Sequence, residues 1–210
     1  MELRTRARRC VGYVGLSVLG LVFAAPTASA QVVPTEQLVA LLRQGGLVLI
    51  VRHASSPQET PSKAAANADN VTLERQLDEA GRSGAIAMGR ALRALMVPIG
   101  EVLTSPAYRA METVRLGQFG TPAPVAELGE GPQGMQGVTE AQAAWLRARV
   151  TQKPKAGNNT IVVTHNPNLA RAFPEWGPTV AQGETVIARP DGASIVVIGR
   201  IKIEDWPRLH

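Results

Sequence analysis

The sequence predicts an α/β fold: a three-layer sandwich with a mostly parallel central sheet, helices on both faces and antiparallel strands at an edge. Helical and strand-like segments alternate along the chain, as they do when helices connect parallel strands. Residues 47–51 are a continuous apolar run, which is typical of a strand buried on both faces, and residues 160–164 predict a second buried strand. Residues 185–188 and 193–203 flank the turn signal Pro190-Asp191-Gly192 and therefore predict an antiparallel pair.

The remaining elements follow from capping residues, apolar periodicity and glycine stops. Thr35 is the expected cap of the first helix, which Gly45-Gly46 ends, and a strand follows directly. The predicted order is helix 35–42, strand 47–51, helix 79–95, strand 102–103, helix 108–116, strand 124–128, helix 139–150, strand 160–164 and the final strand pair.

Two stretches have no clear periodicity. Residues 54–70 are rich in Ser, Pro, Asn and Ala, and they follow the first strand, where open α/β sheets bind their ligands. We expect this stretch to shape the choice of ligand. Residues 127–137 form a second, glycine-rich loop.

Residues 1–30 have the pattern of a signal peptide. Four arginines precede an apolar run at 11–25, and Ala28-Ser29-Ala30 supplies the small residues that a signal peptidase reads. The run is shorter than the ~20 residues that span a bilayer as a helix. We expect cleavage after Ala30 by the general secretion route, a periplasmic or secreted protein, no membrane span after cleavage, and one domain over 31–210. The alternative is an uncleaved N-terminal anchor.

The predicted signal segment accounts for most of the chain's basic character. Without residues 1–30, the counts fall from 22 basic and 17 acidic residues to 18 and 16. A net charge of +2 gives no support to nucleic-acid binding, which needs a clustered basic face. The one cysteine, Cys10, also lies in this segment, so residues 31–210 offer neither a disulfide nor a thiol nucleophile.

Two histidines stand at the ends of predicted strands. The chain has three histidines, and His210 is its last residue. His53 and His165 each follow a hydrophobic strand directly, at the edge where a parallel sheet binds its ligand. Arg52 precedes the first histidine, and Arg109 comes after another strand end. We expect these four side chains to converge.

Such a cluster suits phosphate chemistry. Guanidinium groups match phosphate oxygens in geometry and stay charged at any working pH. A neutral imidazole can attack phosphorus, and a protonated one can donate to the oxygens as charge shifts in the transition state. Arginines beside both histidines would repel a metal ion, so we expect no metal and no other cofactor. No serine stands in the G-x-S-x-G pattern of a serine hydrolase.

Three blocks of the sequence resemble the histidine phosphatase superfamily, which includes the phosphoglycerate mutases. Residues 47–54, ending in Arg52-His53-Ala54, resemble its strand and R-H-G signature. Residues 105–113 are similar to its S-P-x-x-R-A-x-x-T block, and residues 161–168 to its third block, a strand ending at the second histidine. The resemblance covers nearly all of 47–206. It implies that His53 is the nucleophile and that Arg52, Arg109 and His165 form the phosphate pocket.

The sequence departs from the family pattern at two positions. Ala54 stands where the family usually has glycine, a change that we interpret as a subgroup trait. Asn166 stands where one branch of the family has an acidic residue that protonates the leaving group. In the other branch this acid is a glutamate from the loop after the third strand, which makes Glu130 and Glu127 the candidates. Glu184 is a third candidate; the alternative is that the loop glutamates are solvated charges and no dedicated acid exists.

Polar residues beside the histidines are further candidates for binding phosphate. Ser105 and Asn166 are placed to contribute a hydroxyl and an amide, and Asn168 is a similar case. Each has a structural alternative, because serine favours strand-end turns and asparagine caps helices.

The sequence-based hypothesis is an exported phosphatase that hydrolyses phosphomonoesters through a phosphohistidine on His53. Its expected substrate is a small organic phosphate, a phosphorylated sugar of the cell envelope or a phosphoprotein. The sequence does not specify the oligomeric state. Two alternatives stay open: a phosphate-binding or regulatory protein of the same fold without significant turnover, and an exported interaction domain that uses the fold only as a scaffold.

Overall fold

A computed structural model describes residues 33–131 and 137–209 of the chain. The predicted signal peptide and His210 lie outside the described residues, as does part of the glycine-rich loop. The described residues form a six-stranded sheet in the order β3-β2-β4-β1-β5-β6. Strands β3, β2, β4 and β1 are parallel, and β5 and β6 continue the sheet antiparallel at one edge. The predicted sheet is confirmed.

The helices and strands alternate as predicted. They are α1 (Thr35–Gln44), β1 (Val48–Arg52), α2 (Glu79–Ala94), β2 (Ile99–Thr104), α3 (Tyr108–Gly117), β3 (Pro122–Pro124), α4 (Glu140–Val150), β4 (Asn159–Thr164), α5 (Asn166–Ala172), β5 (Thr185–Asp191) and β6 (Ser194–Ile201). Three 3₁₀ turns complete the described part: η1 (Ala126–Leu128), η2 (Gly177–Thr179) and η3 (Trp206–Arg208).

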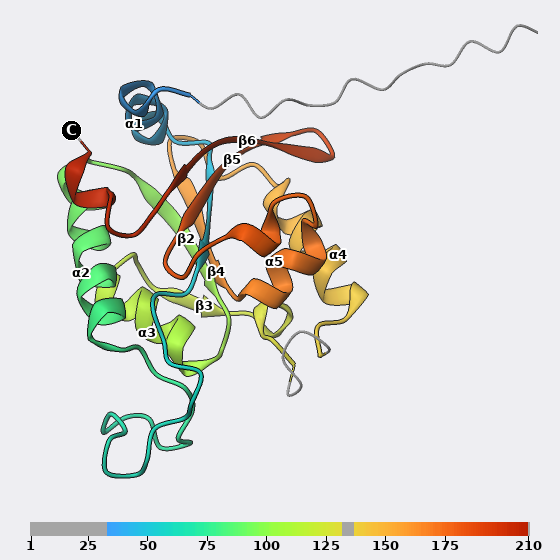
Figure 1. Cartoon of the computed structure of the whole chain (residues 1–210). Coiled ribbons are helices and arrows are strands. Elements are labelled where there is room, and N and C mark those ends of the chain that lie inside the picture. Colours follow the sequence, from blue (N-terminus) through green and yellow to red (C-terminus); the bar gives the residue numbers. More distant parts are fainter. Residues whose placement is uncertain (1–32, 132–136, 210) are drawn as a thin grey trace, which may run out of the picture.

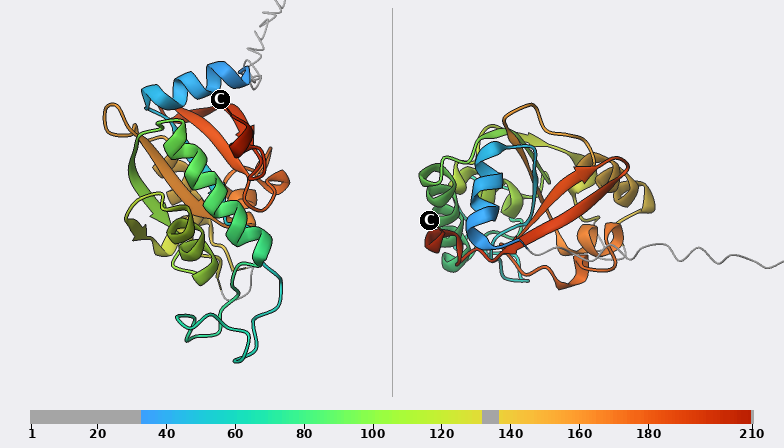
Figure 2. Two further views of the ribbon diagram at one scale, coloured as in Figure 1. Left: turned by 90° about the vertical axis from the view of Figure 1, so that its left-hand side faces the viewer. Right: turned by 90° about the horizontal axis from the view of Figure 1, so that it is seen from above.

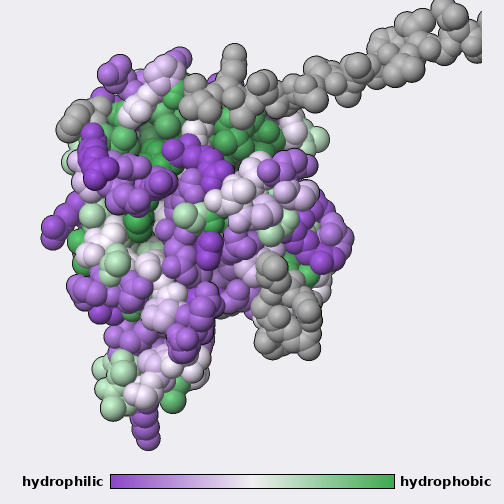
Figure 3. Space-filling model, viewed as in Figure 1, coloured by the Kyte–Doolittle hydropathy of each residue, from purple (hydrophilic) through white to green (hydrophobic). Residues whose placement is uncertain are grey.

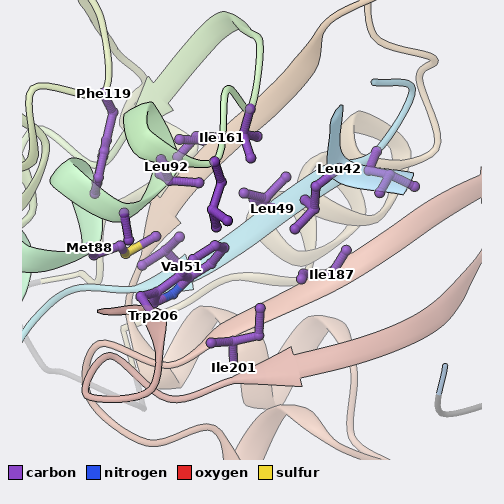
Figure 4. Packing of buried hydrophobic residues seen from close by; sticks show 14 of the residues in the cluster. Leu42, Leu49, Val51, Met88, Leu92, Phe119, Ile161, Ile187, Ile201 and Trp206 are labelled. Atoms are coloured by element: carbon purple, nitrogen blue, oxygen red, sulfur yellow. The ribbon is translucent and has the colours of Figure 1, made fainter. Parts of the chain in front are cut away.

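The sheet lies between two layers of helices (Figures 1 and 2). Alternate residues of β1 point to opposite faces, since side chains along a strand alternate. Leu49 and Val51 join a cluster with residues of α1, α2 and α3, shown in Figure 4, whereas Val48 and Ile50 join one with α4 and α5. Because both faces are covered, every position of 48–51 must be apolar, which explains the continuous run in the sequence.

One predicted strand is misplaced. The strand expected at 124–128 is the three-residue β3, which ends at Pro124, and η1 follows it. Pro122 and Pro124 cannot donate to a ladder and are confined to a sheet edge, which is where β3 lies. Leu128 turns inward instead, with no exposed surface, and packs in the cluster with α4 and α5.

The longest irregular segment is the β1–α2 loop, residues 53–78. It protrudes below the body of the molecule in Figure 1, and its tip carries both hydrophobic and hydrophilic residues in Figure 3. Val71 and Leu73 in this loop are 84% and 37% exposed and belong to none of the buried hydrophobic clusters. Within 33–131 and 137–209, no helix is long and apolar enough to cross a bilayer.

Candidate active site

Strand register brings the two histidines together. Arg52 pairs with Thr164, so His53 and His165 leave adjacent parallel strands side by side. The His53 amide donates to the carbonyl of Thr164 at 3.0 Å, and the Ser105 amide donates to that of Val163 at 2.9 Å. The centroids of the two imidazole rings are 5.1 Å apart. The carboxyl edge of the sheet therefore collects both histidines and Ser105.

His53 is buried and neutral, with one ring nitrogen free to act as a nucleophile. Its Nδ1 lies 2.8 Å from the carbonyl oxygen of Ala54, an acceptor only, so Nδ1 carries the proton. Nε2 therefore has its lone pair, and it accepts from Arg109 Nε at 3.2 Å. Burial, together with the charge of Arg109, lowers the pKa of His53 to about 3. At neutral pH the ring is uncharged.

His165 is neutral as well, with the opposite tautomer. Arg109 Nη2 donates to its Nδ1 at 3.0 Å, so the proton lies on Nε2, which donates to Ser105 Oγ at 2.7 Å. Burial, together with the neighbouring charge of Arg109, lowers its pKa well below the ordinary value. The sequence suggests a protonated imidazole as a donor in the transition state, whereas burial in the structure favours an uncharged His165.

Arg109 joins the two histidines through one guanidinium group. It lies in the first turn of α3, is 4% exposed, and contacts both imidazoles at once. Burial, together with the charge of Arg75, lowers its pKa to about 10, so it remains protonated at neutral pH. A cation between two neutral rings is a binding site for an anion.

Arg52 lies at the same strand end. Its Nη1 donates to the carbonyl of Val180 at 2.8 Å, and its Nε is buried without a partner among the described residues. The charge of Arg52 contributes to the lowered pKa of both His53 and His165, which places it within their electrostatic reach.

Glu130 is the acidic residue of this cluster. Its carboxylate forms an ion pair with Arg109 Nη2 and lies 4.0 Å from Arg75 Nη1. Two anchors hold the chain just before it: the Thr164 hydroxyl donates to the carbonyl of Leu128 at 2.8 Å, and Asn168 Nδ2 donates to that of Gly129 at 3.0 Å. Glu130 thus reaches the pocket from the loop where it was predicted.

The other two carboxylate candidates lie elsewhere. Among the described residues, no hydrogen bond or ion pair joins the Glu127 carboxylate to the cluster. Glu184 accepts from Arg200 Nε at 2.7 Å and from the Ala181 amide at 2.8 Å. Burial opposes its ionisation, but the bonds from Arg200 and Ala181 outweigh burial and hold its pKa below the ordinary value. Glu184 is therefore the ion-pair partner of Arg200, and among the described residues no hydrogen bond or ion pair joins its carboxylate to the cluster.

The asparagines do not cap α5, and their amide groups donate to backbone carbonyls. Asn166 Nδ2 donates to the carbonyl of Pro178 at 3.2 Å, and Asn168 holds the glycine-rich loop as described. His165 occupies the capping position, and its side chain makes no capping bond. Binding of phosphate by the Asn166 side chain stays a prediction.

Arg75 belongs to the site and was not predicted. Its Nε donates to the carbonyl of Pro57 at 2.6 Å and its Nη2 to that of Ser56 at 3.3 Å, which leaves Nη1 toward Glu130. Its charge lowers the pKa of His53, His165 and Arg109. No local pattern marks it, because it lies in an irregular loop far along the chain from each of its partners.

Ala54 fits its position although the resemblance calls for glycine. Its carbonyl orients His53, and its amide donates to Thr113 Oγ1 at 3.1 Å. Its methyl group is fully buried in a small cluster with Leu77 and Ala85. The methyl group therefore packs against Leu77 and Ala85 and leaves the backbone contacts of Ala54 intact.

Solved structures with a similar fold are histidine phosphatases. The protein histidine phosphatase SixA in complex with tungstate shares 18% identity at a TM-score of 0.56, over 76% of this chain and 98% of that one. A putative phosphohistidine phosphatase SixA from Agrobacterium tumefaciens shares 15% at 0.52, over 74% and 97% of the two chains. A putative α-ribazole-5'-P phosphatase from Escherichia coli shares 16% at 0.54, over 76% and 98%.

The chain has the fold of these proteins, so the predicted fold resemblance is confirmed. Neither a family model nor a curated protein matches the sequence.

Proposed function

We propose that this chain is an exported phosphatase that hydrolyses phosphomonoesters through a phosphohistidine intermediate on His53. One observation carries the proposal: the Ala54 carbonyl keeps His53 in the tautomer whose Nε2 lone pair faces the Arg109 guanidinium. A neutral nucleophile is thereby held beside a buried cation that attracts a phosphate group.

The first half-reaction transfers the phosphoryl group to the protein. Substrate phosphate takes the place of Nε2 and of the Glu130 carboxylate as the partner of Arg109. His53 Nε2 then attacks phosphorus, the bond from phosphorus to the ester oxygen breaks, and Glu130 gives a proton to the departing oxygen. Arg52 and Arg75 add positive charge around the transferring group, and His165 Nε2–H is a donor for its oxygens.

The second half-reaction restores the protein. Glu130, now a carboxylate, takes a proton from water, whose oxygen attacks phosphorus as the bond to Nε2 breaks. Inorganic phosphate leaves, and His53 is again neutral. The proton that Glu130 takes from water replaces the one that it gave to the ester oxygen, so the complete cycle leaves its protonation unchanged.

The proposed substrate is a small phosphomonoester, such as a phosphorylated sugar of the cell envelope. Neighbours of the same fold support this class, since one is described as an α-ribazole-5'-P phosphatase and another as a phosphoserine phosphatase. Glu130 also favours turnover over the alternative of phosphate binding alone, because a protein that only binds phosphate needs no carboxylate in the pocket.

The decisive experiment compares the chain from Gln31 with its His53→Ala variant on an aryl phosphate, without added metal. Turnover is expected in the unaltered protein and absent in the variant. Rapid quenching at neutral pH should also trap an acid-labile phosphoryl group on the unaltered protein only. Equal turnover in both proteins would rule out His53 as the nucleophile.

Export rests on residues 1–30 of the sequence. Expression of the full chain in a secreting bacterium is expected to yield periplasmic or secreted protein whose first residue, by mass spectrometry, is Gln31. A protein that keeps residues 1–30 and stays with the membrane fraction would support the uncleaved anchor instead.

A further inference from the structure

The β1–α2 loop is fastened to α3 by carboxylates. Glu74 reaches from the loop to the helix, where its Oε2 accepts from the Tyr108 amide at 3.0 Å. Glu112 reaches from the helix to the loop, where its Oε2 accepts from the Leu77 amide at 2.9 Å. Asp69 Oδ1 adds a third contact by accepting from the Tyr108 hydroxyl at 2.5 Å. These contacts hold in place a loop in which Val71 and Leu73 are exposed rather than packed.

Arg75 lies between the first two of these attachments. Glu74, just before it, is tied to the first turn of α3, and Leu77, two residues after it, is tied to Glu112. Leu77 is also 1% exposed and packs in the small cluster behind Ala54. The backbone on both sides of Arg75 is therefore fixed relative to the helix that carries Arg109.

Glu112 is a buried carboxylate that the proposed chemistry does not use. It is 2% exposed and lies three residues after Arg109, nearly one turn further along α3. Its Oε1 accepts from Asn67 Nδ2 at 3.0 Å, and its Oε2 accepts from the Leu77 amide, so two neutral donors converge on it. No ion pair compensates it among the described residues, and a charge buried without a cation is costly.

The donors explain why a carboxylate stands here. Two N–H groups approach the two oxygens of one side chain, an arrangement in which both oxygens accept. A glutamine has one oxygen and one NH2 group, so its oxygen would accept from one of these donors while its NH2 group, itself a donor, would face the other. The geometry thus matches an acidic residue whose role is to hold backbone in place.

We infer that Glu112 is a positioning residue that acts through Arg75: by fixing the loop on α3, it sets the Arg75 guanidinium over the phosphate pocket. The inference rests on the proposed function, because it assigns to Arg75 a part in binding the substrate's phosphate. Residues 54–70, which are expected from the sequence to shape ligand choice, would thereby influence the pocket through Arg75, which follows them in the same loop.

A double-mutant cycle on phosphate binding tests this inference. Inorganic phosphate is titrated by calorimetry into the unaltered protein, Glu112→Ala, Arg75→Ala and the double variant, so that the readout does not require turnover. We expect Arg75→Ala to weaken phosphate binding about tenfold, as the loss of a hydrogen bond to a charged group does. Glu112→Ala should weaken it by a similar factor, and the double variant no further than Arg75→Ala alone.

Control variants separate positioning from general stability. Glu36→Ala, an exposed carboxylate of α1, is expected to leave phosphate affinity unchanged. If Glu112→Ala does not fold, Glu112→Gln replaces it; this variant keeps one acceptor, so its smaller loss should likewise vanish in the Arg75→Ala background.

The outcomes distinguish failure of the positioning role of Glu112 from failure of the proposed function. Losses that multiply in the double variant, or a folded Glu112→Ala protein with unchanged phosphate affinity, would overturn the positioning role and leave the proposed function standing. Unchanged affinity in Arg75→Ala would do the same. An unaltered protein that binds no phosphate and hydrolyses no aryl phosphate would overturn the proposed function itself.

Discussion

Replacing Glu130 by glutamine tests both roles of its carboxylate: the ion pair with Arg109 and the proposed transfer of a proton to the leaving oxygen. The Glu130 side chain is 22% exposed and that of Arg109 is 5% exposed, so the ion pair is only partly screened by water. A bond of this kind contributes about 1–2 kcal/mol after discounting for the exposed carboxylate. Incoming phosphate must displace it, so Glu130→Gln is expected to tighten inorganic phosphate binding about tenfold.

Turnover should change in the opposite direction. Loss of a general acid costs roughly 10²- to 10⁴-fold in rate when the leaving oxygen needs a proton. An alkyl phosphate should therefore lose that factor in kcat, whereas p-nitrophenyl phosphate, whose leaving group departs as a stable anion, should lose less than about tenfold.

The assay is steady-state hydrolysis of both esters, with inorganic phosphate as a competitive inhibitor. Glu127→Gln is the matched control, since it alters a glutamate three residues away whose carboxylate forms no hydrogen bond or ion pair with the cluster in the described part of the chain, and it should behave as the unaltered protein. Equal losses on both esters, or an unchanged inhibition constant for phosphate in Glu130→Gln, would refute the assignment.

Three further predictions concern stability. The pKa of His53 falls from 6.5 to about 3 on folding, and that of His165 also falls. The unfolded chain therefore binds more protons than the folded one below pH 6.5, so stability is full above pH 6.5 and is lost as pH drops toward 3. The free energy of unfolding, measured by denaturation at each pH, should decline by at most about 1.4 kcal/mol per pH unit for each histidine. A His165→Gln protein whose free energy of unfolding declines just as steeply would contradict this. Gly89→Ala places a methyl group 1.8 Å from the last carbonyl of α3 and should cost about 1–3 kcal/mol in urea denaturation, whereas Arg90→Ala, exposed on the same helix, should cost nothing measurable. Ala54→Gly removes a buried methyl group but keeps the carbonyl that orients His53; a loss of about 1 kcal/mol with retained turnover is expected, and lost turnover would show that the methyl group matters for chemistry.

The sequence alone was enough to predict the sheet and the four residues at its carboxyl edge. A strand buried on both faces must be continuously apolar, so 48–51 and 159–164 are recognisable without a structure, apart from the polar end residues. Parallel strands end at a common edge, so side chains that directly follow them must gather. His53 and His165 follow this rule, because each comes directly after a parallel strand. Their positions in the sequence therefore determined where they lie.

Tertiary structure decided which loop side chains join them. The choice of Glu130 over Glu127 depends on how Thr164 and Asn168 hold the backbone between them, and no periodicity encodes that anchoring. Glu184 forms its ion pair with Arg200 on the neighbouring strand instead.

Arg75 shows the same limit most clearly. Its place over the pocket depends on hydrogen bonds from its guanidinium to Ser56 and Pro57 and on the attachment of its loop to α3. Strands and helices reveal the direction of a side chain through their repeat, whereas in an irregular loop each direction is set by contacts with residues distant in sequence. The sequence therefore determined the sheet and the place of His53 at its edge, and only the folded chain determined that Glu130 and Arg75 lie beside Arg109.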